Sequence, residues 1–435
     1  MLKLFKRSKP EVLVVGAGPV GLFAALQLVK LGVRPRIIDA EQGGATRSYA
    51  LALHPRSLEL LAGLGLASQV LEQARRIDRV GIYDGPERTG QIELSRLPGP
   101  FPFLAIMAQS HLEDLLAGEL AEHGIAIEWN HRLADIVVHG DHVAATVDRL
   151  EKVSTGYAVM HMETVTTSSK SIDIPFVLGA DGHDSLVRKK LGIGFDSVEP
   201  AQHFAVVEFQ SESTALPDEL RIVIDDESTN VLWPMPRGRY RWSFELEHEI
   251  AGETRRKDQF LASKGFPDVD PETIDELIRR RAPWFAGDLR DAHWRIVVRF
   301  EHRLASSFGD RRVWLAGDAG HLTGPVGVQS MNVGLREAAT LCDLYARVLH
   351  GDAAVDALSG YGRERLDEWR FLLGLVPRLA PSRPASGLAA RASRLVSCIP
   401  ASGGHLDRAL DQLGLAAARV PSGENAGPQA ARPAS

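Results

Sequence analysis

The first strong pattern of apolar and polar residues predicts a strand, a tight turn, a helix and a second strand. The run 12–15 is short, apolar and β-branched, which is typical of a buried strand. Residues 20–31 form a mostly apolar segment that predicts a helix, and Gly32 marks its end. Residues 36–38 predict a second strand, which ends at Asp39. This order of elements predicts the start of an α/β domain.

Longer patterns continue along the chain. Leucines at helical spacing predict a helix over 109–123, and a long apolar face predicts another over 328–349. Strict alternation of apolar and polar residues between 201 and 246 predicts an antiparallel sheet. Short strands between 132 and 177 predict a β-meander, with a turn in the Ser/Thr-rich stretch 164–171.

Three glycines between the first strand and the first helix carry the first candidate chemistry. Gly16, Gly18 and Gly21 stand in G-x-G-x-x-G spacing. The first makes the tight turn, the second lets the backbone approach a pyrophosphate, and the third lets the helix pack close to the strand. Asp39 follows the last glycine by 18 residues, where a carboxylate accepts ribose hydroxyls. The pattern predicts a dinucleotide at the helix N-terminus but does not separate FAD from NAD.

Composition narrows the class of protein. A chain of 435 residues with 44% hydrophobic and 24% charged residues is ordinary for a globular protein of about two to three domains. The net charge of −6 gives no electrostatic argument for nucleic acid as a partner. Two cysteines, Cys342 and Cys398, exclude a disulfide scaffold and a cysteine-based zinc site, and no residue set predicts a metal.

No targeting or membrane segment is expected. The basic N-terminus has no apolar stretch of the kind found in a secretory signal. The apolar run 12–29 is interrupted by three glycines and Pro19, which argues against a membrane span. We therefore expect a cytoplasmic protein that does not cross a membrane.

Two later segments carry further motifs. Residues 178–191 read LGADGHDSLVRKKL and contain D-G-x-x-S-x-x-R, which begins at Asp181. Residues 313–341 read VWLAGDAGHLTGPVGVQSMNVGLREAATL, and Asp318 follows a predicted strand there. Ligands bind at such strand ends in open α/β sheets, and the helix that follows the loop adds unpaired N–H groups beside it.

Together the three motifs resemble those of the flavoprotein aromatic hydroxylases, the single-component FAD monooxygenases of the para-hydroxybenzoate hydroxylase type. They stand in the order and spacing of that family, and the resemblance covers about residues 10–375. It implies the α/β fold class, with a Rossmann-like FAD-binding domain interleaved with an antiparallel-sheet, α+β substrate domain. We expect the FAD-binding domain at 10–75, 100–190 and 295–378, the substrate domain at 76–99 and 195–293, and a C-terminal helical segment and disordered tail at 379–435.

The resemblance also implies a reaction. NAD(P)H reduces FAD, O₂ adds at flavin C4a, and the resulting hydroperoxide delivers one oxygen atom to an electron-rich aromatic or polyketide-like small molecule. The outcome is a hydroxylation or a related oxygen insertion, in which the cofactor carries the chemistry and the protein orients it and excludes water. We expect a monomer or a homodimer with no nucleic-acid partner.

Site residues follow from the motifs and from the resemblance. By resemblance, Asp318 holds ribitol hydroxyls, Arg47 reaches the pyrophosphate and Gln109 contacts the flavin. The backbone N–H groups of Met331 and Asn332 face the N1–O2 edge of the flavin. The full set expected to bind cofactor is Gly16, Gly18, Val20, Gly21, Asp39, Arg47, Gln109, Asp181, Asp318, Pro325, Gly327, Met331 and Asn332.

The sequence identifies no catalytic residue. Candidates to line the substrate site lie on the alternating strands, and only about half of them can face inward. They are His203, Arg221, Trp233, Tyr240 and Trp242. His203 or Tyr240 could deprotonate a phenol, and nothing in the sequence selects one.

Departures from the family pattern leave alternatives open. Ser330 stands where the family usually has glycine, and its hydroxyl is expected to crowd or hydrogen-bond the peroxide. Arg336-Glu337 stand where Gln/Asp-Asp is frequent.

One alternative function is an FAD-dependent reductase or dehydrogenase acting on a prenyl or lipid substrate. Others are a non-enzymatic flavin-binding protein and a plain NAD dehydrogenase.

Overall fold

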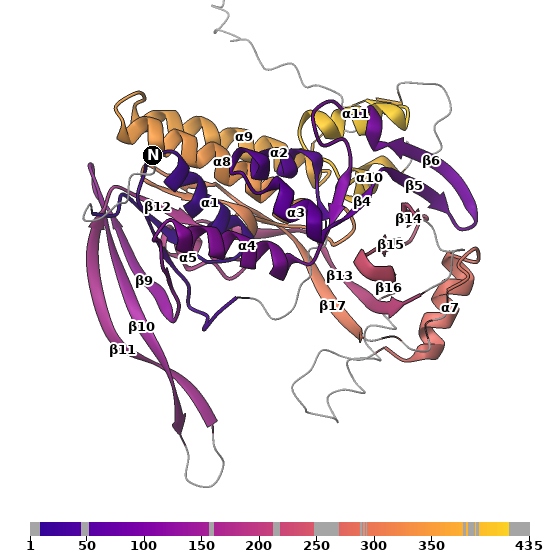
Figure 1. Ribbon diagram of the computed structural model, residues 1–435, viewed down its shortest axis with the longest axis horizontal. Coiled ribbons are helices and arrows are strands. Elements are labelled where there is room, and N and C mark those ends of the chain that lie inside the picture. Colours follow the sequence, from indigo (N-terminus) through magenta and orange to yellow (C-terminus); the bar gives the residue numbers. More distant parts are fainter. Residues whose placement is uncertain are drawn as a thin grey trace, which may run out of the picture.

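The molecule, seen in a computed structural model, combines a helix-covered parallel sheet, a large antiparallel sheet and a projecting β-arm (Figure 1). The structure describes residues 9–44, 52–155, 161–211, 218–247, 269–287, 289, 292, 294–376, 380–381, 388 and 391–416. Within these residues, no helix is both long enough and apolar enough to span a membrane.

The parallel sheet has six strands and contains the first predicted strand at its centre. β1 (Val12–Val15) pairs in parallel with β2 (Pro35–Ile38) on one side and β12 (Phe176–Gly179) on the other. All four residues of β1 are buried, because both faces of this sheet are covered. The outer strands are β8 (Ile127–Glu128), β19 (Val313–Leu315) and the antiparallel edge strand β18 (Gly309–Asp310).

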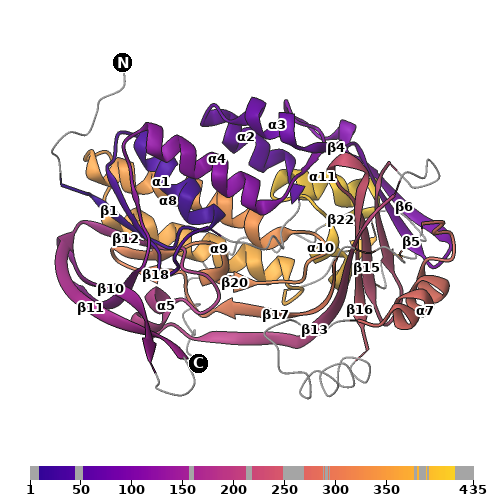
Figure 2. The same ribbon diagram turned by 60° about the horizontal axis from the view of Figure 1, so that its bottom comes forward.

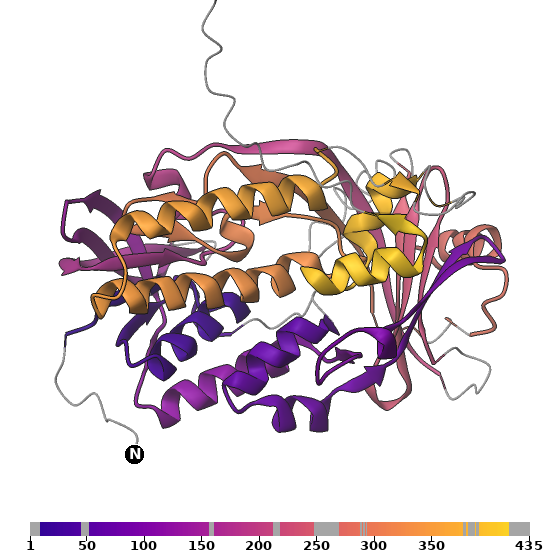
Figure 3. The ribbon, with the colours of Figure 1, turned by 90° about the horizontal axis from the view of Figure 1, so that it is seen from above.

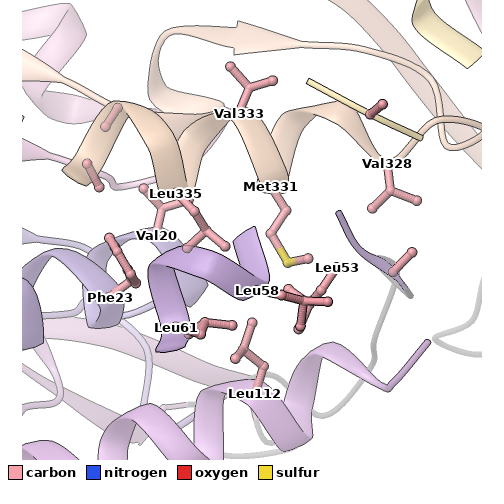
Figure 4. Close-up of a cluster of buried hydrophobic side chains, with 14 of the residues drawn as sticks. Val20, Phe23, Leu53, Leu58, Leu61, Leu112, Val328, Met331, Val333 and Leu335 are labelled. Atoms are coloured by element: carbon pink, nitrogen blue, oxygen red, sulfur yellow. The ribbon is translucent and has the colours of Figure 1, made fainter. Parts of the chain in front are cut away.

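Helices from both ends of the chain pack against this sheet and against each other. The first helix is α1 (Pro19–Lys30), which contacts α4 (Gln109–Glu122) and the long helix α8 (Gln329–Leu349). In Figure 4 the side chains of Val20, Leu112 and Met331 point into one buried cluster from these three helices. The remaining helices of this layer are α2 (Pro55–Gly63), α3 (Ala67–Gln73) and α9 (Leu358–Leu372), and α9 runs beside α8 (Figure 3). The short helix α5 (Leu186–Lys190) packs on the opposite face of the sheet, where Val187 contacts the cluster of Leu13 and Val15.

The second large sheet has eight strands and is antiparallel except where β14 meets β5. Its order is β20 (His321–Leu322), β17 (Trp294–Ala305), β13 (Phe195–Gln210), β16 (Arg239–Leu246), β15 (Thr229–Pro234), β14 (Leu220–Ile224), β5 (Arg79–Asp84) and β6 (Glu87–Glu93). Alternation gives it two apolar faces: Phe204 and Val206 join the main core, whereas Ala205 and Val207 pack under α7 (Pro271–Arg281). The predicted antiparallel sheet is confirmed.

The β-arm is an antiparallel meander, as predicted, but its strands are longer than expected. β9 (His131–Val138), β10 (Val143–Thr155) and β11 (His161–Ile174) form a separate three-stranded sheet, and β10 and β11 are one long hairpin. The turn predicted at 164–171 is wrong, because these residues pair along β10. Threonine is β-branched and suits a strand, so the Ser/Thr-rich composition here marks an exposed strand rather than a turn.

The C-terminal segment packs into the body of the molecule. α10 (Ala392–Cys398) and α11 (Gly404–Gln412) lie between the helical layer and the eight-stranded sheet (Figure 2). Leu395, Leu406 and Leu410 from these helices are buried in the main core.

The remaining elements are short. One small sheet contains β3 (Ala52–Leu53), β7 (Leu104–Ile106) and β4 (Arg75–Ile77), and another pairs β21 (Ala380–Pro381) with β22 (Leu415–Ala416). Short 3₁₀ turns span Leu94–Arg96, Pro236–Gly238, Gly317–Ala319 and Val355–Ala357.

Candidate functional site

A cavity of about 620 Å³ lies where the sequence motifs meet. Its walls come from the glycine loop before α1, the start of α4, the loop after β12, the middle of β17, and the segment from the end of β19 to the first turn of α8. The lining residues are Gly18, Pro19, Val20, Gln109, Ala180, Gly182, His183, Arg299, Phe300, Glu301, Ala316, Asp318, Leu322, Thr323, Gly324, Pro325, Val328, Ser330 and Met331. Five segments that are far apart in sequence therefore share one cavity.

The glycine loop shows which of its glycines the protein itself requires. Gly16 has φ of 103°, and a Cβ there would lie 2.2 Å from the carbonyl oxygen of Ala180. A Cβ on Gly21 would lie 2.0 Å from the carbonyl oxygen of Gly16, so this glycine lets α1 pack against the turn. Gly18 has φ of −74°, and a Cβ there would meet no atom within 4 Å. Because no protein atom requires glycine at position 18, its open side faces space suited to a ligand.

The start of α1 and the loop after β19 are in direct contact. A Cβ on Gly334 of α8 would lie 2.8 Å from Val20 Cγ2 and 3.0 Å from Gly317 Cα. A Cβ on Gly317 would lie 3.0 Å from the same methyl group of Val20. The first and last motifs of the sequence therefore meet at van der Waals distance, and Val20 is the residue between them.

Asp39 fixes the glycine loop from the end of β2. Its Oδ2 accepts a hydrogen bond of 2.6 Å from the Ala17 N–H, and its Oδ1 accepts one of 2.7 Å from the Glu41 N–H. The half-buried carboxylate does not line the cavity. Its contact with a ribose therefore stays a prediction, and the hydrogen bonds give it a role in holding the loop.

Asp318 lines the cavity, and the backbone that carries it is held by a buried network around Glu337. The carboxylate of Glu337 accepts hydrogen bonds from the Gly317 N–H at 2.8 Å, His321 Nε2 at 2.9 Å and Trp369 Nε1 at 2.7 Å. The rings of His321 and Trp369 stack with centroids 3.6 Å apart. Burial acts to raise the pKa of Glu337, but His321 and its hydrogen bond outweigh burial, and the pKa lies below its ordinary value.

The first turn of α8 offers hydrogen-bond donors to the cavity. Val328 precedes the helix with φ of 50°, and no side chain caps the helix start. The N–H groups of the first turn have no acceptor inside a helix. The hydroxyls of Ser330 and Thr323 are buried, line the cavity and have no hydrogen-bond partner within the described residues. Buried polar groups are nearly always paired in proteins, so these hydroxyls indicate a polar ligand.

Asn332 and Gly327 serve the local structure rather than the cavity wall. The amide oxygen of Asn332 accepts hydrogen bonds from the His54 N–H at 2.8 Å and Ser57 Oγ at 2.7 Å, which ties α8 to α2. A Cβ on Gly327 would lie 2.2 Å from the carbonyl oxygen of Ser397. Pro325 and Met331, in contrast, line the cavity. The predicted contacts of all four with the cofactor stay predictions.

The C-terminal segment holds the loop that precedes α8, and no sequence motif indicated this contact. Gln329 Nε2 contacts the carbonyl oxygens of Ile399 at 2.5 Å and Ala401 at 3.0 Å. His54 Nε2 lies 2.9 Å from the carbonyl oxygen of Gly327. Burial lowers the pKa of His54 to about 3, so this histidine is neutral and its Nε2–H donates to Gly327.

The middle motif braces the site. Asp181 accepts hydrogen bonds from Ser185 Oγ at 2.5 Å and from the N–H groups of Leu186 and Val187, so it holds the start of α5, whose N-cap residue is Ser185. Burial raises the pKa of the Asp181 carboxyl despite these hydrogen bonds. Arg188 is buried and donates to the carbonyl oxygen of Ala319 at 2.8 Å, which ties α5 to the loop that carries Asp318.

The predicted substrate-lining residues lie outside this cavity. Tyr240 and Trp242 pack under α7, on the face of the eight-stranded sheet opposite the main core. Trp233 is 1% exposed within the main core. Arg221 donates to Glu219 at 2.9 Å and lies over the ring of Trp284.

His203 lines a separate cavity of about 480 Å³. The roles of these residues in substrate binding stay predictions.

The eight-stranded sheet instead contributes Arg299, Phe300 and Glu301 of β17 to the main cavity, and alternation alone did not indicate them. Gln109 lines that cavity as well, with its amide bonded to Glu113 at 2.8 Å, whereas Arg47 lies outside the described residues.

Comparison with known proteins identifies the family. The model of the FAD binding domain family matches residues 9–370. The chain therefore belongs to this FAD-binding family, and FAD is the dinucleotide that the glycine motif left open. The open side of Gly18, the unpaired hydroxyls and the uncapped start of α8 suit such a ligand.

Two curated relatives carry names of oxygenases. The chain is 31% identical over 369 residues to the 6-methylpretetramide 4-monooxygenase of Streptomyces rimosus. The aligned region covers 82% of this chain and 59% of that relative. It is 27% identical over 370 residues to the pentachlorophenol 4-monooxygenase of Sphingobium chlorophenolicum. This aligned region covers 81% of this chain and 61% of that relative. The chain spans less than two thirds of the length of these relatives.

Solved structures share the fold. The p-nitrophenol 4-monooxygenase PnpA from Pseudomonas putida DLL-E4 matches with a TM-score of 0.69 and 22% identity, over 93% of this chain and 92% of that one. Aklavinone-11 hydroxylase in a ternary complex with FAD and aklavinone matches with a TM-score of 0.65 and 24% identity, over 93% and 73%. The expected fold class and the resemblance to the FAD hydroxylases are confirmed.

Proposed function

We propose that this protein is an FAD-dependent monooxygenase that uses NAD(P)H and O₂ to hydroxylate, or otherwise oxygenate, an electron-rich aromatic or polyketide-like small molecule. The single observation that carries the proposal is the cavity of about 620 Å³, because the glycine loop, the loop of Asp318 and the start of α8 all line it. Its volume lies in the range of cofactor and ligand sites.

The lining divides into parts with separate tasks. Gly18, Asp318 and the first turn of α8 are the groups that would hold FAD, through close backbone approach, a carboxylate and unpaired N–H groups. When bound, FAD supplies the redox and oxygen chemistry. Phe300 and Leu322 offer apolar surface that suits a flat aromatic substrate.

Charged groups sit beside that apolar surface. Arg299 pairs with Glu301, and both line the cavity, so the pair adds no net charge there. Glu301 also accepts from Arg303 at 2.7 Å. A neutral or weakly polar substrate suits this lining better than a strongly charged one, because a buried charge needs a partner of opposite sign.

The names of the relatives favour an oxygenase over the reductase or dehydrogenase alternative. The 12-dehydrotetracycline 5-monooxygenase/anhydrotetracycline 6-monooxygenase of Streptomyces rimosus is also 26% identical to this chain over 363 residues. The polyketide names among the relatives support that substrate class here. The division into domains at 10–75, 100–190, 295–378 and at 76–99, 195–293, a monomer or homodimer, and a cytoplasmic location stay predictions.

The test is a screen of phenols, anilines and polyketide-like quinols with FAD-loaded protein. NAD(P)H oxidation, O₂ uptake and H₂O₂ are measured together, and oxygenated product is quantified. We expect one substrate class to stimulate NAD(P)H oxidation with O₂ uptake equal to product formed. Substrate turnover without O₂ uptake would support the reductase alternative, and bound FAD with no stimulated oxidation would support the non-enzymatic one.

A further inference from the structure

A second cavity, of about 380 Å³, lies where α11 begins beside α2 and α8, and it shares no lining residue with the FAD cavity. Its lining includes Arg56 and Glu59 of α2, Arg336 of α8, and Gly404 and Arg408 of α11. Ser402, two residues before α11, lines it as well. Arg336 is one of the residues at which the sequence departs from the hydroxylase pattern.

The charge of this second cavity is positive. Three guanidinium groups line it against one carboxylate, and Arg56 already bonds that carboxylate, Glu59, at 2.5 Å. Arg336 uses Nη1 to donate to Glu368, which lies outside the lining. Arg408 is exposed and makes no ion pair with any residue that the structure describes. An anion therefore meets a favourable field here, and a cation does not.

The start of α11 adds backbone donors to the same place. The helix has nine residues, begins at Gly404 after Gly403 with φ of 57°, and has no side-chain cap. The Leu406 N–H already donates to the carbonyl oxygen of Gly403 at 2.9 Å, but the N–H groups of Gly404 and His405 have no acceptor inside the helix and carry the positive end of its dipole. A Cβ on Gly403 would lie 3.2 Å from Arg336 Nη2, so the guanidinium sits directly over the helix start.

Ser402 is an independent sign of a ligand. The residue is 2% exposed and lines the cavity, and its hydroxyl has no hydrogen-bond partner among the described residues. Nearly all buried hydroxyls in proteins are paired. The hydroxyl does not cap α11, although it directly precedes the Gly403 cap position.

We propose that this cavity binds a phosphate group, as the free ion or as a small phosphate monoester. A tetrahedral oxyanion has enough acceptor oxygens to take hydrogen bonds from the helix N–H groups, the Ser402 hydroxyl and the guanidinium of Arg408 at once. The site is separate from the FAD cavity, so it does not depend on the reaction proposed above.

The test titrates inorganic phosphate into FAD-loaded protein in a calorimeter, in chloride buffer at constant ionic strength. FAD occupies its own phosphate-binding loops and keeps them out of the measurement. Arg408→Gln and Ser402→Ala are each expected to weaken phosphate binding about tenfold, the effect of losing one charge-assisted hydrogen bond. The matched control is Arg347→Gln, an exposed arginine of α8 outside both cavities, which is expected to leave binding unchanged.

The source of the phosphate group is read from a second titration with glycerol 3-phosphate, using glycerol as its blank. Tighter binding of the monoester than of inorganic phosphate assigns the site to a phosphorylated small molecule, and equal or weaker binding assigns it to the free ion. Absence of binding by both probes at millimolar concentration overturns the proposal. It is also overturned if Arg408→Gln and Ser402→Ala bind phosphate as tightly as Arg347→Gln does.

Discussion

Gly334→Ala tests the contact between the two ends of the site. The new Cβ would lie 2.8 Å from Val20 Cγ2 and 3.0 Å from Gly317 Cα, whereas carbon atoms pack at about 3.5–4.0 Å. Val20 cannot relieve the clash alone, because the second contact is backbone. Overpacking of this kind costs about 1–3 kcal/mol, and the better helix propensity of alanine offsets about 1 kcal/mol. We expect the variant to be destabilised by up to about 2 kcal/mol.

The larger effect of Gly334→Ala falls on FAD. The shift separates the loop of Asp318 from the glycine loop, so we expect FAD affinity to fall at least about tenfold, or about 1.4 kcal/mol. Affinity is measured by quenching of flavin fluorescence, and stability by thermal unfolding of FAD-free protein.

The control for this experiment is Gly118→Ala, in the exposed middle of α4, where a Cβ meets no atom within 4 Å. It is expected to gain about 0.5–1 kcal/mol of stability and to keep its FAD affinity. The reasoning is refuted if Gly334→Ala gains stability as the control does and binds FAD equally well.

Three further perturbations test other parts of the site. Burial lowers the pKa of His302 to about 4 from 6.5, so on acidification the unfolded chain takes up this proton before the folded protein does. This residue alone therefore makes the unfolding free energy fall by about 1.4 kcal/mol per pH unit between about pH 6.5 and 4. His302→Gln should reduce the pH dependence of the unfolding free energy, measured with urea between pH 7 and 5, and an unchanged pH dependence contradicts this. Ser330→Gly is expected to change the share of NAD(P)H that yields product rather than H₂O₂, and equal coupling in both proteins counts against a role for that hydroxyl. Glu337→Gln puts an amide donor against Gly317 or Trp369 and should lower unfolding stability by about 2–3 kcal/mol, so an unchanged urea midpoint argues against the network.

Local patterns in the sequence predicted the elements that carry the site. The run 12–15, the three glycines and the alternation between 201 and 246 each encode their structure within a few neighbouring residues. The turn predicted at 164–171 was wrong because the composition of this stretch is typical of both turns and exposed strands. Only its long pairing with β10 determines that it is a strand.

The features that the sequence did not predict depend on contacts between distant segments. Glu337 lies 16 positions from His321 and 32 from Trp369, so no local period reveals that it holds both. Residues 399 and 401 likewise meet Gln329 only through the folding of α10 and α11. Alternation showed that the strands between 201 and 246 have two faces, but not which face meets the cavity, and this is why Tyr240 was a candidate. Phe300 was not, because it lies in the stretch 295–378 that was assigned to the FAD-binding domain.

FAD titration of Gly18→Val against the unaltered chain tests the central claim most directly. A side chain at position 18 meets no protein atom within 4 Å of its Cβ, and the backbone at φ of −74° and ψ of −178° suits a β-branched residue. We predict that FAD-free stability stays within about 0.5 kcal/mol. We also predict that FAD affinity falls at least about a hundredfold, or about 2.7 kcal/mol, because the valine occupies the path of the pyrophosphate. Equal FAD affinity of the two proteins would contradict the claim that the glycine loop and the loop of Asp318 hold one FAD in this cavity.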